Sequence, residues 1–159
     1  MPKRKSTREH LLNTGAMIVG ESGLRALTVR GLSLRAGTNT GSFVYHFGNR
    51  EAFLTELLER WYEPLFTGIR IHANIHLPAF EKLEAILGDV MEFLLRHGQF
   101  IAQLVLDALA GEQAAIRFIS GIHTRHPLVL LETIREAQQE GSVLMGDLSL
   151  IHISEPTRP

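Results

Sequence analysis

The chain has 159 residues, of which 45% are hydrophobic and 21% are charged, so its length fits one domain or at most two small ones. The absence of cysteine excludes a disulfide framework and thiolate chemistry, and it leaves only the eight histidines and the carboxylates as metal ligands. No stretch approaches the roughly 18 consecutive apolar residues of a membrane span, and no apolar signal segment follows the basic start. We therefore expect a cytoplasmic protein with no membrane partner.

Charge is divided unevenly along the chain. Residues 1–50 hold eight Lys or Arg and two acids, a charge of +6, while the remaining residues hold eight bases and fifteen acids, a charge of −7. A basic segment joined to an acidic body favours a polyanion as the partner of the basic segment. The alternative is a chance asymmetry of solvated surface.

Apolar residues recur at spacings of three and four, with no sustained period of two, which predicts helices and no strands. Four short helices are expected first. They are Thr7 to Ser22, a second helix from Val29 through Leu34 that Thr28 caps and Gly37 ends, Thr40 to His46 or Phe47, and Arg50 to Tyr62, which Asn49 caps. The second and third are separated by a Gly-containing turn. They therefore form a helix-turn-helix unit, a motif that presents its second helix to the major groove of DNA.

Longer helices are expected after residue 62. Pro64 is expected to end or kink the fourth helix, unless it lies in the first turn of a new one that continues to about Ala73. Further helices are expected over 78–98, 100–109, 112–122 and 128–140. The sequence therefore predicts an all-α protein.

A continuous pattern covers residues 28–54. Its parts are Thr28-Val29-Arg30, Ala36-Gly37, Gly41-Ser42-Phe43, Tyr45-His46-Phe47 and Asn49-Arg50-Glu51. With the helix upstream, these parts make residues 6–57 resemble the DNA-binding domain of TetR-family (tetracycline-repressor-like) bacterial transcription regulators. Four positions depart from the family pattern: Gly15 and Gly31, where a better helix former is usual, and Ser33 and Thr38, where Ala and a buried Val are usual. We expect these departures to lower stability.

The resemblance implies a three-helix helix-turn-helix domain over 4–60, followed by a helical effector-binding and dimerisation body over 61–147 that is incomplete. It implies a regulator, more often a repressor, that acts at the bacterial nucleoid without a cofactor. Such a regulator binds a palindromic operator in double-stranded DNA as a homodimer and is released by a small-molecule effector. The two further helices that form the family's dimer interface do not follow residue 147. Two outcomes therefore stay open for this chain, a dimer or a monomer that binds half-sites weakly.

Nine residues are expected to contact DNA on this resemblance. Arg30 would read a base edge, with a solvated surface arginine as the alternative. Base edges or thymine methyl groups would be contacted by the outward residues Thr40, Ser42 and Val44, with Gly41 permitting close approach. Backbone phosphates would be bound by Thr28, Tyr45, His46 and Arg50. The alternatives are a core aromatic at Tyr45 and a structural histidine at His46, while Phe43 and Phe47 are assigned to the core.

Aromatic residues of the body are candidates for a ligand cavity between helices, and the alternative is plain core. They are Trp61, Phe66, Phe93, Phe100 and Phe118.

His72 and His76 are four residues apart, a spacing that places both imidazoles on one face of a helix. We expect no metal site, because third and fourth ligands are not evident. We also expect no catalytic residue, because no phosphate loop, nucleophile elbow or Glu-flanked His pair occurs. The rivals of a regulator are a helical scaffold or binding protein and a small helical enzyme that uses His72 and His76.

Residues 148–159, Leu-Ser-Leu-Ile-His-Ile-Ser-Glu-Pro-Thr-Arg-Pro, lack helical and strand punctuation. They are similar to the translation of a sequencing-adapter read-through, which predicts that this tail is not native. The alternative is a natural apolar tail with a Pro-bounded end.

Overall fold

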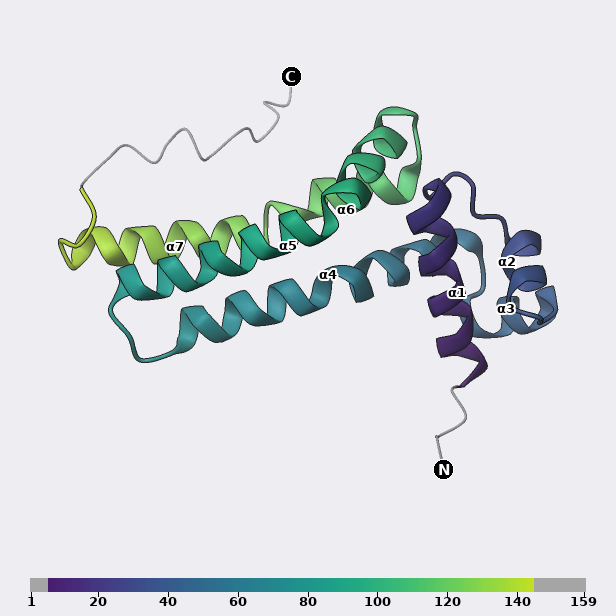
Figure 1. Cartoon of the computed structure of the whole chain (residues 1–159), viewed down its shortest axis with the longest axis horizontal. Helices are drawn as coiled ribbons and strands as arrows, with labels where there is room; N and C mark the ends of the chain where they lie inside the picture. Colours follow the sequence, from purple (N-terminus) through teal and green to yellow (C-terminus); the bar gives the residue numbers. More distant parts are fainter. Residues whose placement is uncertain (1–5, 145–159) are drawn as a thin grey trace, which may run out of the picture. The chain divides into compact units, whose positions relative to one another are not determined.

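The computed structural model describes residues 6–144, and within them every regular element is an α-helix (Figure 1). The helices are α1 (Thr7–Ser22), α2 (Val29–Arg35), α3 (Thr40–Phe47), α4 (Arg50–Asn74), α5 (Ala79–Leu109), α6 (Gln113–Ile122) and α7 (His126–Gln139). The all-α fold predicted from the apolar spacing is confirmed. The predicted non-native tail over 148–159 lies outside the described residues.

Side-chain caps set the starts of the helices in residues 6–57, a segment that we call the head. The caps are Ser6, Thr28, Asn39 and Asn49, whose side-chain oxygens each accept a hydrogen bond from the backbone N–H three residues along. Each cap satisfies an N–H that has no partner inside the helix. α3 ends at Gly48, whose φ of +75° suits glycine. The predicted bounds of α1, α2 and α3 are therefore confirmed.

Two helices are longer than the sequence pattern predicts. α4 continues through Pro64 to Asn74. α5 continues through Gly98, where we expected one helix to end and another to begin. Proline removes one backbone donor and glycine costs about 1 kcal/mol relative to alanine, but neither loss ends a helix whose apolar spacing continues on both sides.

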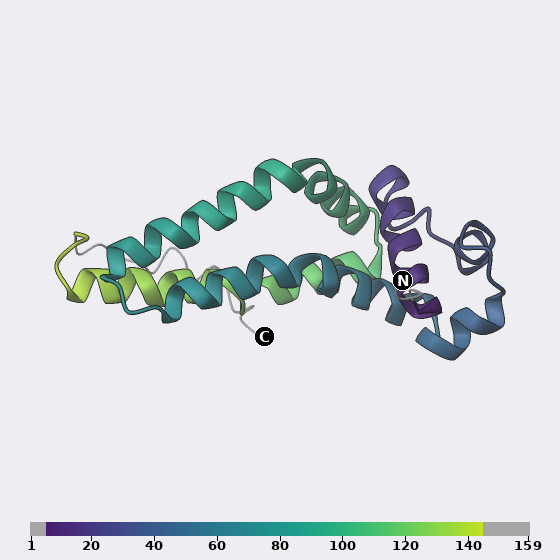
Figure 2. The ribbon, with the colours of Figure 1, turned by 60° about the horizontal axis from the view of Figure 1, so that its bottom comes forward.

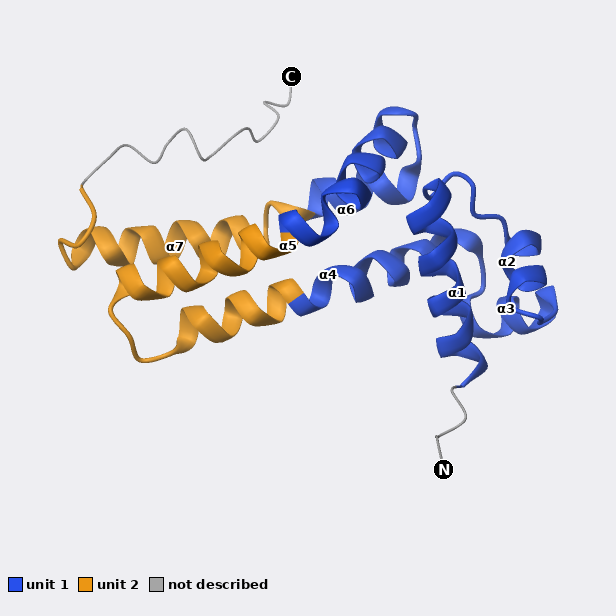
Figure 3. Cartoon of the chain, viewed as in Figure 1, with its two compact units in different colours: residues 1–64, 94–121 blue, residues 65–93, 122–159 orange. Residues whose placement is uncertain are grey.

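The chain forms two compact units (Figure 3). Within the described residues, unit 1 comprises residues 6–64 and Leu94–Gly121, and unit 2 comprises Leu65–Phe93 and residues 122–144. Unit 1 therefore contains the head together with the C-terminal part of α5 and nearly all of α6. Within residues 6–144, every helix falls short of the length or the apolarity of a bilayer-spanning segment.

In the head, α1, α2 and α3 pack against one another (Figure 2). Three aromatic rings lie at the centre of this packing: Phe43 and Phe53 are fully buried, and Phe47 is 8% exposed. Their centroids are 5.5 Å apart for Phe43 and Phe47, 5.4 Å for Phe43 and Phe53, and 4.8 Å for Phe47 and Phe53. Burying each such ring contributes about 1.5–3 kcal/mol, so this aromatic cluster fixes one face of α3 and leaves the other outward.

Gly15 on α1 makes room for the aromatic cluster. A Cβ atom at Gly15 would lie 2.5 Å from Cζ and 2.8 Å from Cε1 of Phe53. The buried Phe53 ring packs against Phe43 and Phe47, so a shift of this ring disturbs the aromatic cluster. The expected stability gain of alanine over Gly15 therefore meets an opposing cost, because the added Cβ requires the Phe53 ring to shift.

Two hydroxyl groups of the head are buried without a hydrogen-bond partner within residues 6–144. They belong to Ser33 in α2 and to Thr38 in the turn before α3. A hydroxyl that loses its water and gains no partner costs about 1–3 kcal/mol. The expected loss of stability at these two positions therefore has a physical cause in the structure.

We predict that the double variant Ser33→Ala, Thr38→Val raises the free energy of unfolding by about 1–3 kcal/mol, because both unpaired hydroxyls are removed while the side-chain shapes are kept. Urea denaturation followed by circular dichroism measures the change, and amide hydrogen exchange in α3 assigns it to the head.

The matched control is Thr14→Val. The buried Thr14 hydroxyl donates to the carbonyl of His10 at 2.9 Å, so its removal relieves no unpaired group. A double variant that gains no more stability than this control would contradict the prediction.

Candidate nucleic-acid interface

α3 presents an exposed face on the side opposite the aromatic cluster. Phe43 and Phe47 point inward, so at the helical period of 3.6 residues the neighbouring side chains point outward. The outward residues are Thr40 and Gly41, which are exposed, Ser42, which is half-buried, Val44, which is 55% exposed, and Tyr45, which is 85% exposed. The helix that the sequence predicts to meet DNA is therefore open to a partner.

Thr28 and Arg30 lie at the start of α2, and both are exposed. The Thr28 hydroxyl oxygen accepts a hydrogen bond from the Gly31 N–H at 3.0 Å, which leaves its own O–H as a donor for a phosphate oxygen. No ion pair or hydrogen bond from the described part of the chain engages the Arg30 guanidinium. Both side chains are therefore available to a ligand.

Tyr45 and His46 differ in exposure. With 85% of its surface exposed, Tyr45 is not a core residue, so that alternative is wrong. The Tyr45 and His46 rings meet edge to face with centroids 5.0 Å apart, and the half-buried His46 lies 6.2 Å from the ring of Phe47. The Tyr45 ring is therefore largely exposed to solvent, whereas the His46 ring is partly buried against the rings of Tyr45 and Phe47.

Two other arginines of the head are paired with carboxylates. Arg35 donates two hydrogen bonds of 2.6 Å to Glu21, which lower the pKa of Glu21 and raise the pKa of Arg35. Arg8 donates to Glu56 at 2.7 Å and lies over the Phe47 ring, with Cζ 5.4 Å from the centroid. These pairs reduce the charge that the two arginines offer to a polyanion.

Arg50 lies at the N-terminus of α4, and its guanidinium is engaged by partners within the chain. Its Nε donates to the carbonyl of Leu27 at 2.7 Å, and its NH2 group donates to the carbonyl of Leu24 at 2.6 Å. The same NH2 group donates to the Glu112 carboxylate at 2.8 Å. Because internal partners occupy the guanidinium, the expected phosphate contact of Arg50 is not supported. Arg50 instead holds the connection between α1 and α2.

Asp107 of α5 also binds the segment between α1 and α2, at Leu24. This carboxylate is 3% exposed, and it accepts hydrogen bonds from Leu24 N–H at 2.7 Å and from Gln103 Nε2 at 3.3 Å. Gly23 has a φ of +80°, and a Cβ there would lie 2.8 Å from Asp107 Oδ2. We call Arg50, Asp107 and Glu112, together with residues 23–28, the joint.

In the joint, the carboxylate of Glu112 forms an ion pair with the guanidinium of Arg50. Burial acts to raise the pKa of this carboxyl, but hydrogen bonds from Arg50 and from the Ala114 N–H, with the charges of Arg50 and Arg117, lower the pKa overall. Neither Asp107 nor Glu112 is among the residues predicted from the sequence. The signal that points to Asp107 is a single acid within the apolar stretch 100–109.

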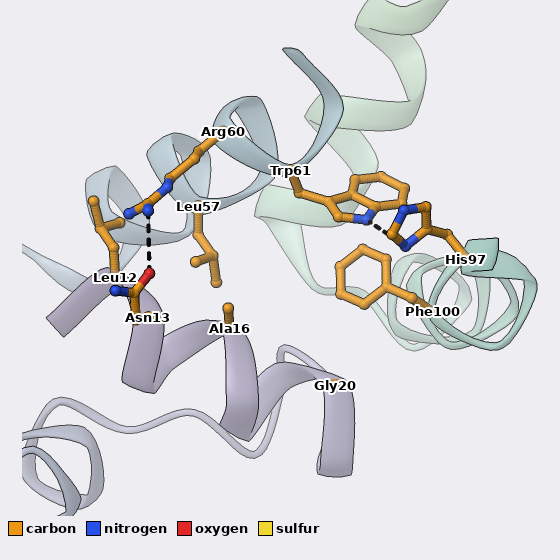
Figure 4. A pocket seen from close by; sticks show the side chains of 9 residues that line it. All are labelled: Leu12, Asn13, Ala16, Gly20, Leu57, Arg60, Trp61, His97 and Phe100. Carbon is orange, nitrogen blue, oxygen red and sulfur yellow. Dashed lines mark hydrogen bonds between the residues drawn. The ribbon is translucent and has the colours of Figure 1, made fainter. Parts of the chain in front are cut away.

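Three of the five aromatic candidates for a ligand site come together in unit 1. The ring of Trp61 lies 4.4 Å from that of Phe100 and 6.1 Å from that of Phe118, measured between centroids. Trp61 and Phe100 line a cavity of about 350 Å³ (Figure 4). Phe66 and Phe93 belong to unit 2, where Phe66 lines a different cavity.

His72 and His76 do not form a pair. α4 ends at Asn74, so His76 lies beyond the helix, and the expectation that both imidazoles share one helical face is wrong. His72 Nδ1 is instead 2.8 Å from Asp89 Oδ2. Over residues 6–144, no three His, Asp or Glu side chains are grouped as metal ligands would be.

Comparison with known proteins agrees with the geometry of the head. The profile of the family "Bacterial regulatory proteins, tetR family" matches residues 11–57. The HTH-type transcriptional repressor KstR2 of Mycobacterium tuberculosis is 33% identical over 92 residues, which are 58% of this chain and 46% of KstR2. The matched part therefore spans less than half the length of this relative.

Solved structures share the fold over most of the chain. The ketosteroid transcriptional regulator KstR2 of Mycobacterium tuberculosis superposes with a TM-score of 0.69 at 23% identity, covering 98% of this chain and 86% of that chain. The TetR family transcriptional regulator PfmR of Thermus thermophilus gives a TM-score of 0.69 at 19% identity, covering 88% and 76%. The predicted order, a helix-turn-helix domain followed by a helical body, is confirmed.

We predict that the effect of Glu112→Gln on stability depends on pH. A carboxylate whose pKa is lowered by folding adds stability above its ordinary pKa of 4.5 and loses that contribution as the pH falls through the folded value. The variant should therefore lower the free energy of unfolding by about 1–2 kcal/mol at pH 7 and by less near pH 3.

Urea denaturation at the two pH values measures the difference. Glu84→Gln, on the exposed surface of α5, controls for the loss of one surface carboxylate. A loss of stability in Glu112→Gln that is the same at both pH values would rule out the ion pair as its cause.

Proposed function

Because residues 11–57 match the profile of the tetR family of bacterial regulatory proteins, we propose that the chain belongs to this family and is a DNA-binding transcription regulator. It is a repressor in this proposal, and it leaves its operator in double-stranded DNA when a small-molecule effector binds. Residues 4–60 bind DNA, and residues 61–147 bind the effector. The family consists of transcription regulators and not of enzymes, so the rival enzyme that uses His72 and His76 has no support.

The observation that carries the proposal is the outward face of α3. The aromatic cluster buries one side of this helix and leaves Val44 and Tyr45 exposed on the other. A major groove about 12 Å wide accepts a helix presented in this way, and side chains on its outer face reach the base edges. The exposed, unpaired Arg30 adds positive charge to the same domain.

The proposed contacts divide into base and phosphate contacts. Arg30 reads a guanine edge, because its fork of donors matches the two acceptors of that base. The outward residues Thr40, Ser42 and Val44 contact base edges and thymine methyl groups, and Gly41 allows the helix to come close. Thr28, Tyr45 and His46 bind phosphates, which positions the domain without selecting a sequence.

Two heads are needed to read a palindromic operator. Each head occupies one half-site, and the two major grooves on the same side of DNA are roughly 34–36 Å apart. Under this proposal two chains bind one operator, and the half-site spacing follows from the distance between their heads. The repressor description of KstR2 supports the negative sign of the regulation.

The joint offers a route from effector to DNA. Arg50 belongs to α4 and Asp107 to α5, and both hold the connection that leads into α2. An effector that displaces α4 against α5 therefore changes the support of the helix-turn-helix. Coupling of this kind is worth about 1–3 kcal/mol in other proteins, enough to change operator affinity by roughly 5- to 150-fold.

We predict that selection from a random pool of duplexes recovers an inverted repeat bound by this chain. The affinity for that repeat should fall steeply with salt, because phosphate contacts release counterions. Recovery of unrelated sequences with no shared motif, or of no duplex at all, would contradict the proposed function and favour the helical scaffold.

We predict that Arg30→Ala weakens binding to the selected repeat by about 1–3 kcal/mol and relaxes the preference at one base pair of each half-site. Binding titrations against the repeat and its single-base variants measure both effects. The matched control is Arg135→Ala, because Arg135 is an exposed arginine of α7, outside the head and the joint. If Arg135→Ala relaxes the same preference, the effect is not specific to Arg30 and Arg30 does not read the base.

A further inference from the structure

The cavity in unit 1 lies between the head and the helices that follow it. Its apolar wall is formed by Leu12 of α1, Leu57 and Trp61 of α4, and Phe100 of α5 (Figure 4). Its volume of about 350 Å³ falls within the range of small-molecule sites, roughly 300–1,000 Å³. A molecule bound there would contact α1 directly.

One permanent charge lies at the edge of this cavity, on the side of Asn13 and away from Trp61 and Phe100 (Figure 4). The NH2 group of Arg60 on α4 donates to Oδ1 of Asn13 on α1 at 3.1 Å (Figure 4). This hydrogen bond uses one of the five N–H groups of the guanidinium. Among residues 6–144, no aspartate or glutamate lines the cavity. The lining is therefore apolar and positively charged.

The other ionisable side chain of the lining is His97. Its Nδ1 accepts a hydrogen bond from Trp61 Nε1 at 3.3 Å, which requires an unprotonated Nδ1. Burial, together with the charge of Arg96, lowers the pKa of His97 from 6.5. Both effects favour the neutral form of His97, so Arg60 is the one side chain of the described lining that carries a permanent charge.

We propose that this cavity binds an organic monoanion with a compact apolar body. The carboxylate of the ligand pairs with the guanidinium of Arg60, because planar carboxylates match the fork of N–H donors. The apolar body lies against Leu57, Trp61 and Phe100. The proposal rests on the proposed function only where it identifies this monoanion as the effector, and it then extends the effector site from residues 61–147 to α1 and Arg60. Binding itself does not require DNA.

The residues of α1 that line the cavity leave room for the apolar body of the ligand. Ala16 and Gly20 of α1 line the cavity with little or no side chain. A Cβ atom at Gly20 would meet no other atom within 4 Å. Enlarging a side chain on this wall therefore offers a way to fill the site without touching Arg60.

The indole nitrogen of Trp61 provides a direct NMR test of ligand binding in the cavity. The chain contains one tryptophan, so a ¹⁵N-labelled sample has one indole N–H resonance, and this resonance reports on the cavity. The probes are 2-naphthoate and 2-naphthamide, which share one apolar body and differ in charge. We expect both to shift the indole resonance and 2-naphthoate to bind about fivefold more tightly, since an exposed guanidinium contributes modestly.

Substitutions identify the charge responsible. Arg60→Gln should remove the preference for 2-naphthoate, and Arg60→Lys should retain part of it. Arg70→Gln, the same change at an exposed arginine of α4 outside the cavity, should leave the preference intact. Ala16→Phe should weaken both probes alike, because it fills the space that their shared body occupies.

Three results would overturn the proposal. They are the absence of an indole shift at millimolar probe, equal affinity for the two probes, and a preference for 2-naphthoate that survives in Arg60→Gln. Failure of the proposed function is distinguishable, because it appears as the absence of operator binding by the unliganded chain. Binding of 2-naphthoate through Arg60 without any operator binding would keep the ligand site and reject the regulator.

Discussion

The contact among Phe43, Phe47 and Phe53 is the constraint on which the rest of the head depends. Two of these rings come from α3 and one from α4, and α1 accommodates them through the missing side chain of Gly15. An eight-residue helix has little stability of its own, so its direction in space comes from this packing. The outward position of Val44 and Tyr45 is therefore a result of what is buried behind them.

The joint connects the head to α5 through hydrogen bonds, whose energy depends strongly on their geometry. A guanidinium from α4 and a carboxylate from α5 hold the peptide groups of one short connection, at Leu24 and Leu27. Buried polar groups are costly unless every partner is in place, so this arrangement tolerates few alternative positions. A small displacement of α4 or α5 therefore moves the residues that lead into α2. The aromatic cluster keeps α1, α2 and α3 packed together during such a displacement.

Short sequence motifs predicted the helix bounds of the head, but they did not predict the contacts between the head and α5 or the residues that follow α5. The caps at Ser6, Thr28 and Asn39 act over three residues, so the bounds of α1, α2 and α3 were readable from short motifs. The placement of Arg50 was not, because it depends on Glu112, which is 62 residues away. Asp107 is 83 residues from Leu24 and was missed for the same reason. The continuity of α5 through Gly98 shows that a single helix-weakening residue does not mark an end when the apolar spacing persists.

The close approach at Gly15 also bears on how this protein can be engineered. A common strategy replaces glycines inside helices by alanine to gain helical propensity, and moves each position toward the residue usual among relatives. At Gly15 the added methyl group would meet the ring of Phe53, whose displacement would be passed on to Phe43 and Phe47. A protein redesigned by that rule would gain helical propensity in α1 but would displace the packing that sets the direction of α3.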